Sequence, residues 1–217
     1  MRSCTSPMRV SVAMTAMTNS AAPAGKPGWI VTHTGRRVWP LELQPSDIVI
    51  DDIAHALAMK CRWGGFCRSF YSVAQHAVLL AAWLERNGGS WQDQWDALHH
   101  DDSEAYLFDL PDPLKVVLPE FLEIENRLQG MIGDIFGCSP VMSERVAEAD
   151  RRIRADEAAA LMVRPSGGWG DHGGGLEPLG IKITPWPPDA ARAAWFAAYD
   201  RLQGSRRKAA MIGAFGG

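Results

Sequence analysis

The sequence predicts one compact all-α domain, a helical bundle with short extended pieces near its N-terminus. Between residues 47 and 202, most segments carry apolar residues at helical spacing and begin or end at residues that typically cap helices. The chain has 217 residues and is 47% hydrophobic, which is sufficient for one substantial core. We therefore expect a domain over residues 29–203, a disordered extension over residues 1–28 and a flexible tail over residues 204–217.

The first part of this domain is expected to be partly extended. Residues 29–50 contain β-branched and aromatic residues that are interrupted by Gly35 and by two prolines. This pattern favours short strands, such as a small hairpin. Ser46 can cap a first helix that begins near Asp47 and runs through Met59.

The next two helices carry the residues on which the functional interpretation depends. Ser72 is a candidate cap of a helix that contains His76. Ser90 is a candidate cap of a third helix, which contains the adjacent pair His100 and Asp101. A glycine-rich break ends the first of these helices, and prolines end the second segment.

Two further helices and a final one complete the predicted bundle. A long helix is expected over residues 120–136, and Ser143 can begin another that contains Asp150. Residues 164–188 are rich in glycine and proline, so we expect a surface loop there. The last helix is predicted over residues 189–202.

Four residues, in the order His…His-Asp…Asp, are candidate ligands of one metal ion: His76, His100, Asp101 and Asp150. Two imidazoles and two carboxylates can hold a divalent ion and leave positions open for water and a phosphate oxygen. Such an ion can activate water and polarise a phosphoryl group. Taken singly, His76 fits a buried core histidine and Asp150 fits a surface carboxylate, but the ordered set favours metal binding.

The sequence around the His-Asp pair offers more than one register, and helical spacing selects one of them. Ala97, His100, Asp101 and Glu104 fall at positions i, i+3, i+4 and i+7, on one face of a helix. Asp102 falls on a different face, which is apolar. We therefore expect Asp101 to be the metal ligand and an Asp102→Ala variant to keep full activity.

Four segments around these residues carry a family resemblance: SVAQH at 72–76, ALHHDDSEAY at 97–106, LFDLPDPLK at 107–115 and ADRR at 149–152. Together they resemble the HD-domain metal-dependent phosphohydrolases. The similarity is greatest to the branch that holds bacterial 5′-deoxynucleotidases and phage deoxynucleoside triphosphate (dATP) triphosphohydrolases. The resemblance covers residues 29–202 and implies the compact HD-domain helical bundle.

The resemblance also implies roles for residues outside the metal ligands. Glu104 matches a catalytic glutamate that handles a proton, next to the catalytic metal ligand Asp101. Asp109 matches an acidic residue that contacts the deoxyribose. Trp63 lies at an aromatic position that can exclude a ribose 2′-hydroxyl. Three basic residues are candidate phosphate ligands: Arg62, Arg68 and Lys115.

No histidine lies between Asp101 and Asp150. HD proteins with two metals place further histidines in that interval, so the resemblance implies a single divalent ion, which could be Co, Mn, Zn, Fe or Mg. The implied activity is hydrolysis of a 2′-deoxynucleotide, by a dNTP (dATP-like) triphosphohydrolase or a 5′-deoxynucleotidase. The segments at 34–41 and 72–76 slightly favour the triphosphohydrolase. The alternative is a non-catalytic nucleotide-binding or regulatory protein on the same scaffold.

The composition excludes several classes of binding partner. A net charge of −3 provides no general attraction to nucleic acid or to an anionic membrane. No apolar run approaches the roughly 18 residues that span a bilayer. The four cysteines show no CxxC spacing, which argues against a zinc ribbon and fits reduced thiols. We expect a cytoplasmic homo-oligomer that binds a small deoxynucleotide.

Overall fold

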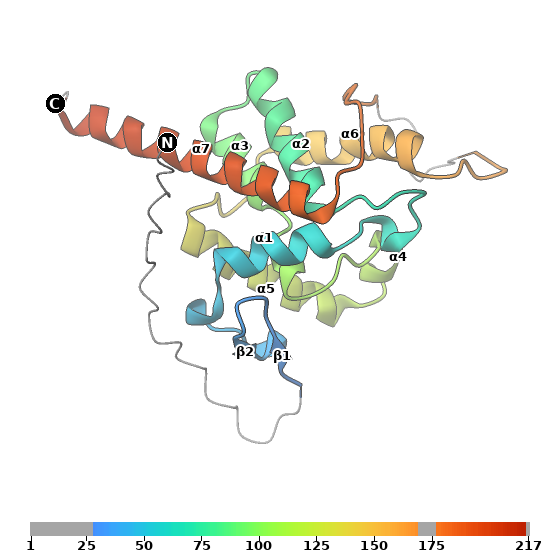
Figure 1. The fold of residues 1–217 in the computed structure, drawn as a ribbon, viewed down its shortest axis with the longest axis horizontal. Coiled ribbons are helices and arrows are strands. Elements are labelled where there is room, and N and C mark those ends of the chain that lie inside the picture. Colours follow the sequence, from blue (N-terminus) through green and yellow to red (C-terminus); the bar gives the residue numbers. More distant parts are fainter. Residues whose placement is uncertain (1–27, 169–176, 216–217) are drawn as a thin grey trace, which may run out of the picture.

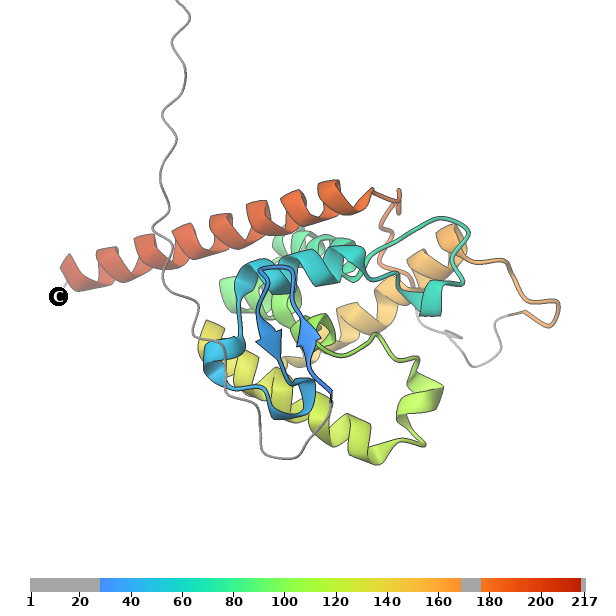
Figure 2. The ribbon, with the colours of Figure 1, turned by 60° about the horizontal axis from the view of Figure 1, so that its bottom comes forward.

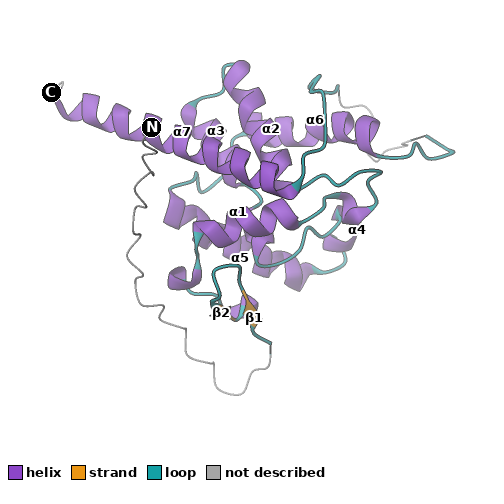
Figure 3. Cartoon of the chain, viewed as in Figure 1, coloured by secondary structure: helices purple, strands orange, loops and turns teal. Residues whose placement is uncertain are grey.

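The computed structural model describes residues 28–168 and 177–215, and these residues form the predominantly helical bundle that the sequence predicts (Figure 3). The strands and α-helices are, in chain order, β1 (Ile30–Val31), β2 (Arg37–Val38), α1 (Ile50–Met59), α2 (Val73–Arg86), α3 (Trp91–His99), α4 (Asp112–Lys115), α5 (Pro119–Phe136), α6 (Glu144–Leu161) and α7 (Pro188–Phe215). Short 3-10 helices are η1 (Pro40–Glu42), η2 (Pro45–Asp47), η3 (Trp63–Gly65) and η4 (Asp102–Ala105). The extension predicted to be disordered lies outside the described residues, apart from residue 28.

Helix α2 lies at the centre of the bundle and contacts α1, α3, α6 and α7 (Figure 1). In a view turned by 60°, α7 covers one side of the body and α5 lies on the opposite side (Figure 2). Ser72 caps α2 as predicted, because its hydroxyl accepts the backbone N–H of Gln75 at 3.1 Å. Leu80 and Leu84 of α2 are fully buried in one large core cluster with Trp95 of α3.

The predicted hairpin near the N-terminus is confirmed. Strands β1 and β2 pair antiparallel, with Ile30 opposite Val38. The turn between them is fixed to α1 by Thr34, whose backbone N–H and hydroxyl donate to Asp52 at 2.7 and 2.9 Å. Helix α1 begins at Ile50, three residues later than predicted. The reason is a capping box in which Asp47 closes the separate turn η2.

Helix α7 is longer than predicted, since it continues through Gly204 to Phe215. A glycine inside a helix costs about 1 kcal/mol relative to alanine, and packing offsets this cost. Trp91 donates its indole N–H to the carbonyl of Leu202 at 2.8 Å, and the Arg206 guanidinium lies over the Trp91 ring. The segment predicted to be a flexible tail is therefore helical up to residue 215.

Helix α3 ends at His99, whereas the sequence predicted a helix that continues through the His-Asp pair. In a continuous α-helix the N–H of Ser103 would donate to the carbonyl of His99. The amide of Gln129 on α5 separates these two groups: it accepts from Ser103 at 2.9 Å and donates to His99 at 2.7 Å. Insertion of a side chain into the helical hydrogen-bond ladder is a recognised cause of a break.

The same turn is fixed from within by a buried pair. His99 Nδ1 lies 2.6 Å from Asp102 Oδ2, and both side chains are fully buried. Asp102 thus lies away from the metal ligands, as predicted, but it is a partner of His99. The expectation that Asp102→Ala keeps full activity stays a prediction, and the buried contact with His99 adds an expected loss of stability.

None of the helices within residues 28–168 and 177–215 combines the length and apolar character needed to cross a membrane.

We predict that Asp102→Ala lowers the free energy of unfolding by about 2–4 kcal/mol, because it leaves a buried imidazole without its partner and opens a small void. Urea denaturation followed by circular dichroism measures this change. Asp134→Ala, on the exposed face of α5, is the control and should alter stability by no more than about 0.5 kcal/mol. A stability of Asp102→Ala equal to that of the control would contradict the structural role.

Candidate metal centre and adjoining cavity

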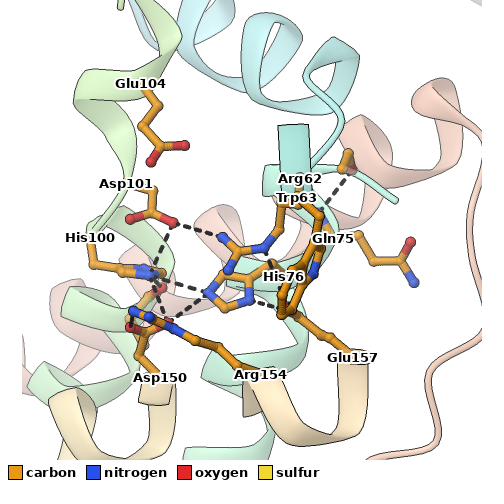
Figure 4. Close-up of polar contacts among 12 residues, drawn as sticks. Arg62, Trp63, Gln75, His76, His100, Asp101, Glu104, Asp150, Arg154 and Glu157 are labelled. Carbon is orange, nitrogen blue, oxygen red and sulfur yellow. Dashed lines mark hydrogen bonds and ion pairs between the residues drawn. The ribbon is translucent and has the colours of Figure 1, made fainter. Parts of the chain in front are cut away.

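Three parts of the fold bring the four predicted ligands together (Figure 4). His76 comes from α2, His100 and Asp101 from the turn after α3, and Asp150 from α6. His76 Nε2 lies 3.0 Å from Asp150 Oδ1 and 3.3 Å from His100 Nε2. His100 Nε2 lies 3.2 Å from Asp101 Oδ2 and 3.6 Å from Asp150 Oδ1. The predicted set is therefore one cluster in space.

The break after α3 explains how two adjacent residues serve one centre. Neighbouring side chains on a continuous α-helix diverge by roughly 100°. Here Asp101 leaves the helix with φ −109° and ψ 17°. The helical face on which the sequence argument placed Asp101 is absent, because α3 ends at His99 and the 3-10 helix η4 begins at Asp102. Asp101 nevertheless lies with His76 and His100 in the group that could hold a metal ion.

Hydrogen bonds fix which nitrogen of each imidazole faces the cluster. His76 Nδ1 lies 2.6 Å from the carboxylate of Glu157, and His100 Nδ1 lies 2.9 Å from the carbonyl of Ala97. Both partners can only accept, so each Nδ1 carries a hydrogen, and Nε2 presents a lone pair whenever the ring is neutral. Two lone pairs 3.3 Å apart cannot form a hydrogen bond with each other. A cation between them satisfies both.

This donor set fits a metal ion. His76, His100 and Asp101 offer ligand atoms that all lie within 4.8 Å of one another, so the group could hold an ion. Metal-binding histidines commonly donate their second nitrogen to a carboxylate or a carbonyl, as both do here. Asp150, whose oxygen lies near both imidazoles, is placed to serve as a fourth ligand.

The pKa shifts of the cluster residues also indicate that this site stabilises positive charge. Burial works against a charged His100, yet the Asp101 and Asp150 carboxylates raise the pKa of its imidazole to about 9. Burial likewise opposes ionisation of Asp150, but the hydrogen bonds and positive charge that His100 and His76 provide when protonated hold the pKa of this carboxyl well below its usual range. A metal ion would supply the same positive charge to the neutral rings. The site is therefore built to stabilise a cation.

Sequence reasoning missed Glu157, which is fully buried beneath the cluster. Besides binding His76, its carboxylate accepts the Tyr71 hydroxyl at 2.9 Å and the Trp63 indole N–H at 3.3 Å. Burial opposes its ionisation, but Arg62, whose Nε lies 3.4 Å away, and His76 lower the pKa of Glu157 to about 2. A signal was available, because Glu157 follows Asp150 by seven residues and so shares its helical face.

Arg62 and Trp63 also contact this carboxylate and lie close to the ligands (Figure 4). Arg62 Nη1 lies 3.3 Å from Asp101 Oδ2, so this guanidinium bridges Asp101 and Glu157. Trp63 adopts φ 59°, a left-handed conformation that is uncommon for a bulky residue. The bond from its indole to Glu157 helps to hold this strained backbone, and such strain is concentrated at functional sites.

A cavity of about 720 Å³ opens beside the metal ligands, a volume in the range of small-ligand sites. It is lined by most of the residues that the sequence nominated: Arg62, Trp63, Asp101, Glu104, Asp109, Lys115 and Asp150. Arg68 lies elsewhere, since its guanidinium donates to the carbonyl of Ala160 at 2.9 Å. Arg154 of α6 lines the cavity and was not predicted.

Glu104 is buried at the wall of this cavity. Its Oε1 lies 4.0 Å from Lys115 Nζ, and its Oε2 has no hydrogen-bond partner among the described residues. Burial, followed by the Asp101 and Asp109 carboxylates, raises the pKa of Glu104 well above its usual value. A carboxyl group in this state can hold a proton near neutral pH.

Lys60 fixes the turn that carries Glu104 and was also missed by sequence reasoning. Its ammonium group donates to the backbone carbonyls of Glu104, Ala105 and Leu107. Burial lowers the pKa of Lys60 to about 8, although Glu104 and Asp109 oppose this change. Nothing in the sequence distinguishes this lysine, because its partners are carbonyl groups about 45 residues away.

Comparison with known proteins finds relatives that match most of this chain. It is 37% identical to the uncharacterized protein YfdR of Escherichia coli over 141 residues, which are 65% of this chain and 76% of YfdR. The chain belongs to the YfdR family. It is also 31% identical to the uncharacterized protein RCAP_rcc00048 of Rhodobacter capsulatus over 192 residues, 82% of this chain and 96% of that protein. No family model matches the chain.

We predict that a divalent metal ion stabilises the wild-type protein and not Asp101→Ala. An ion that binds only the folded state stabilises it by about 2.7 kcal/mol at one hundred times its Kd. Thermal melting with excess Mn²⁺ and with EDTA measures the difference. Asp51→Ala, which alters an exposed acidic group on α1, should respond like the wild type. An equal metal-induced shift in Asp101→Ala would remove Asp101 from the ligand set.

We predict that Glu157→Gln lowers metal affinity by about 10–100-fold, because the amide no longer orients His76 through a charged acceptor. Isothermal titration calorimetry with Mn²⁺ measures the Kd directly. Glu148→Gln on the same helix is the matched control, since Glu148 is exposed and pairs only with Arg152. An unchanged Kd in Glu157→Gln would show that the carboxylate only fills the core.

Proposed function

We propose that this protein is a metal-dependent phosphohydrolase that acts on 2′-deoxynucleotides, built on an HD-domain scaffold. One observation carries the proposal: the Nε2 atoms of two imidazoles and two carboxylates converge beside a cavity that also contains a Glu104 carboxyl oxygen with no hydrogen-bond partner among the described residues. This arrangement supplies a place for a divalent ion and, next to it, a group that can transfer a proton.

In this proposal His76, His100, Asp101 and Asp150 would hold one divalent ion, Mn, Co, Fe, Zn or Mg. When bound, the ion would supply an activated water and polarise the phosphoryl group. Glu104 would hold the proton that passes to the leaving oxygen, or accept one from the attacking water.

The remaining cationic side chains of the cavity would bind phosphate oxygens. Arg62 and Lys115 have this role in the proposal, and Arg154 joins them because its buried Nε has no hydrogen-bond partner among the described residues. Each is already paired with a carboxylate: Arg62 with Asp101, Lys115 with Glu125 and Arg154 with Asp150. The cavity therefore has little positive charge that is not already balanced by a carboxylate.

The charge of the cavity lining indicates how many phosphate groups the substrate would carry. Three Arg and Lys side chains and five Asp and Glu side chains line the cavity, so with Glu104 protonated and one divalent ion bound their formal charge would be +1. A triphosphate carries more negative charge than a monophosphate and would find no matching excess. The balance favours a nucleoside monophosphate, whereas segments of the sequence slightly favoured a triphosphate.

The sugar would lie against Trp63, with Asp109 accepting a hydrogen bond from the 3′-hydroxyl. Both residues line the cavity, and the Trp63 ring is fixed through its indole N–H by Glu157. A rigid wall is what steric exclusion of a 2′-hydroxyl requires, so these contacts support the preference for deoxyribose.

The test is a panel of dNMPs, dNTPs and the matching ribonucleotides with several divalent metals, with the products separated by chromatography. Release of inorganic phosphate from dNMPs, and its loss in EDTA, is the expected result. Release of triphosphate from dNTPs would identify the other reaction. Binding of deoxynucleotides without formation of any product would contradict the proposed enzymatic activity and favour a regulatory protein on the same scaffold.

We predict that Glu104→Gln retains metal and deoxynucleotide binding but loses about 100-fold or more in kcat, the usual scale for a general acid–base group. Elemental analysis checks the metal content, and steady-state kinetics checks turnover. Glu123→Gln, an exposed change on α5, is the matched control and should keep wild-type kcat. Loss of bound metal in Glu104→Gln would make this residue a ligand instead.

A further inference from the structure

The cavity beside the metal ligands has two chemically different halves. The charged residues described above include the predicted ligands, whereas the apolar lining comes from three segments: residues 64–66, residues 110–113 and one face of α6. Within the second segment, Asp112 is the charged exception and pairs with Arg154 at 2.6 Å. Among the apolar lining residues, Phe66, Leu110, Pro111 and Ala158 have no side-chain hydrogen-bonding group. This half cannot recognise a phosphate, and it suits a flat apolar group.

Helix α6 connects the two halves. Asp150 and Arg154 lie on the charged side, and the cavity wall then continues along the helix through Ala155, Ala158 and Ala159. These alanines are spaced i, i+3 and i+4, so they share one face and form a shallow surface. Ala158 lies just over two helical turns beyond Asp150, which is roughly 12 Å along the axis. A group bound there is remote from the metal but within reach of the same small molecule.

Phe66 lies at this apolar end and is 82% exposed, the largest exposed fraction among the large hydrophobic residues of the described chain. The loop before it has left-handed backbone at Gly64 and Gly65, with φ 58° and 79°. A Cβ placed on Gly64 would be in ordinary van der Waals contact with the Phe66 ring at 3.5 Å and with Pro111 at 3.9 Å, so the ring and Pro111 lie beside the same glycine. An aromatic ring exposed at a ligand cavity gains contact area when a second ring stacks on it.

We propose that the apolar half of the cavity is a nucleobase subsite and that Phe66 stacks on the base of the substrate. The inference rests on the proposed function, because the cluster at Asp150 would hold the phosphate and the distance along α6 separates phosphate from base. Stacking on an aromatic side chain contributes to binding for any base, since every base has a π-face. Phe66 thus determines specificity for a nucleotide over a plain sugar phosphate.

The experiment separates base binding from phosphate binding. For wild type, Phe66→Ala and Phe66→Trp, kcat/KM is measured for the hydrolysed deoxyadenosine nucleotide, dAMP or dATP. Inhibition constants are measured for 2′-deoxyadenosine, which lacks phosphate, and for inorganic phosphate, which lacks a base. Phe108→Ala is the matched control, because Phe108 is 73% exposed but does not line the cavity.

We expect Phe66→Ala to lower kcat/KM, and to raise the inhibition constant of deoxyadenosine, by roughly 10- to 100-fold, the range for one base–aromatic stack. The inhibition constant of phosphate should stay unchanged, Phe66→Trp should restore the wild-type values, and Phe108→Ala should match the wild type. An unchanged deoxyadenosine constant in Phe66→Ala, or an equal rise for phosphate, overturns the subsite. Absence of any deoxynucleotide hydrolysis by the wild type overturns the proposed function itself.

Discussion

The candidate site depends on a single amide group. Gln129, which projects from α5, occupies the place of the hydrogen bond between the N–H of Ser103 and the carbonyl of His99. A helix cannot continue when its ladder is opened in this way, so α3 ends and the chain turns. Because of this turn, His100 and Asp101 can both contribute to one centre, although they are adjacent in sequence. The buried pair of His99 and Asp102 stabilises the same turn from inside the core.

Helix α6 organises the rest of the site along one axis. Asp150 contributes to the ligand cluster, and Glu157 two turns later supports His76 from beneath. Between and beyond them, the side of the helix that faces the cavity changes from the charged Arg154 to small alanines. The spacing of these residues therefore fixes how far the charged and apolar ends of the cavity lie apart.

The network around Glu157 joins the metal ligands to the wall of the cavity. This carboxylate binds His76 on one side and the indole of Trp63 on the other, and Arg62 connects it to Asp101. A buried carboxylate is costly unless it is fully paired, and here four groups pair with it. The strained backbone at Trp63 is tolerated because these contacts hold it in place.

The sequence by itself determined the all-α class, most helix starts and the four candidate ligands that the structure brings together. Local signals were sufficient for these features. The hydroxyls of Ser72, Ser90 and Ser143 cap helices by binding backbone N–H groups three residues later, which does not depend on the tertiary fold. The His…His-Asp…Asp order can be recognised directly in the sequence. Only the tertiary structure decided the end of α3, the continuation of α7 to Phe215 and the roles of Glu157 and Lys60. Each depends on a partner distant in sequence, such as Gln129 for α3 or Trp91 for α7, and helical periodicity contains no information about such partners.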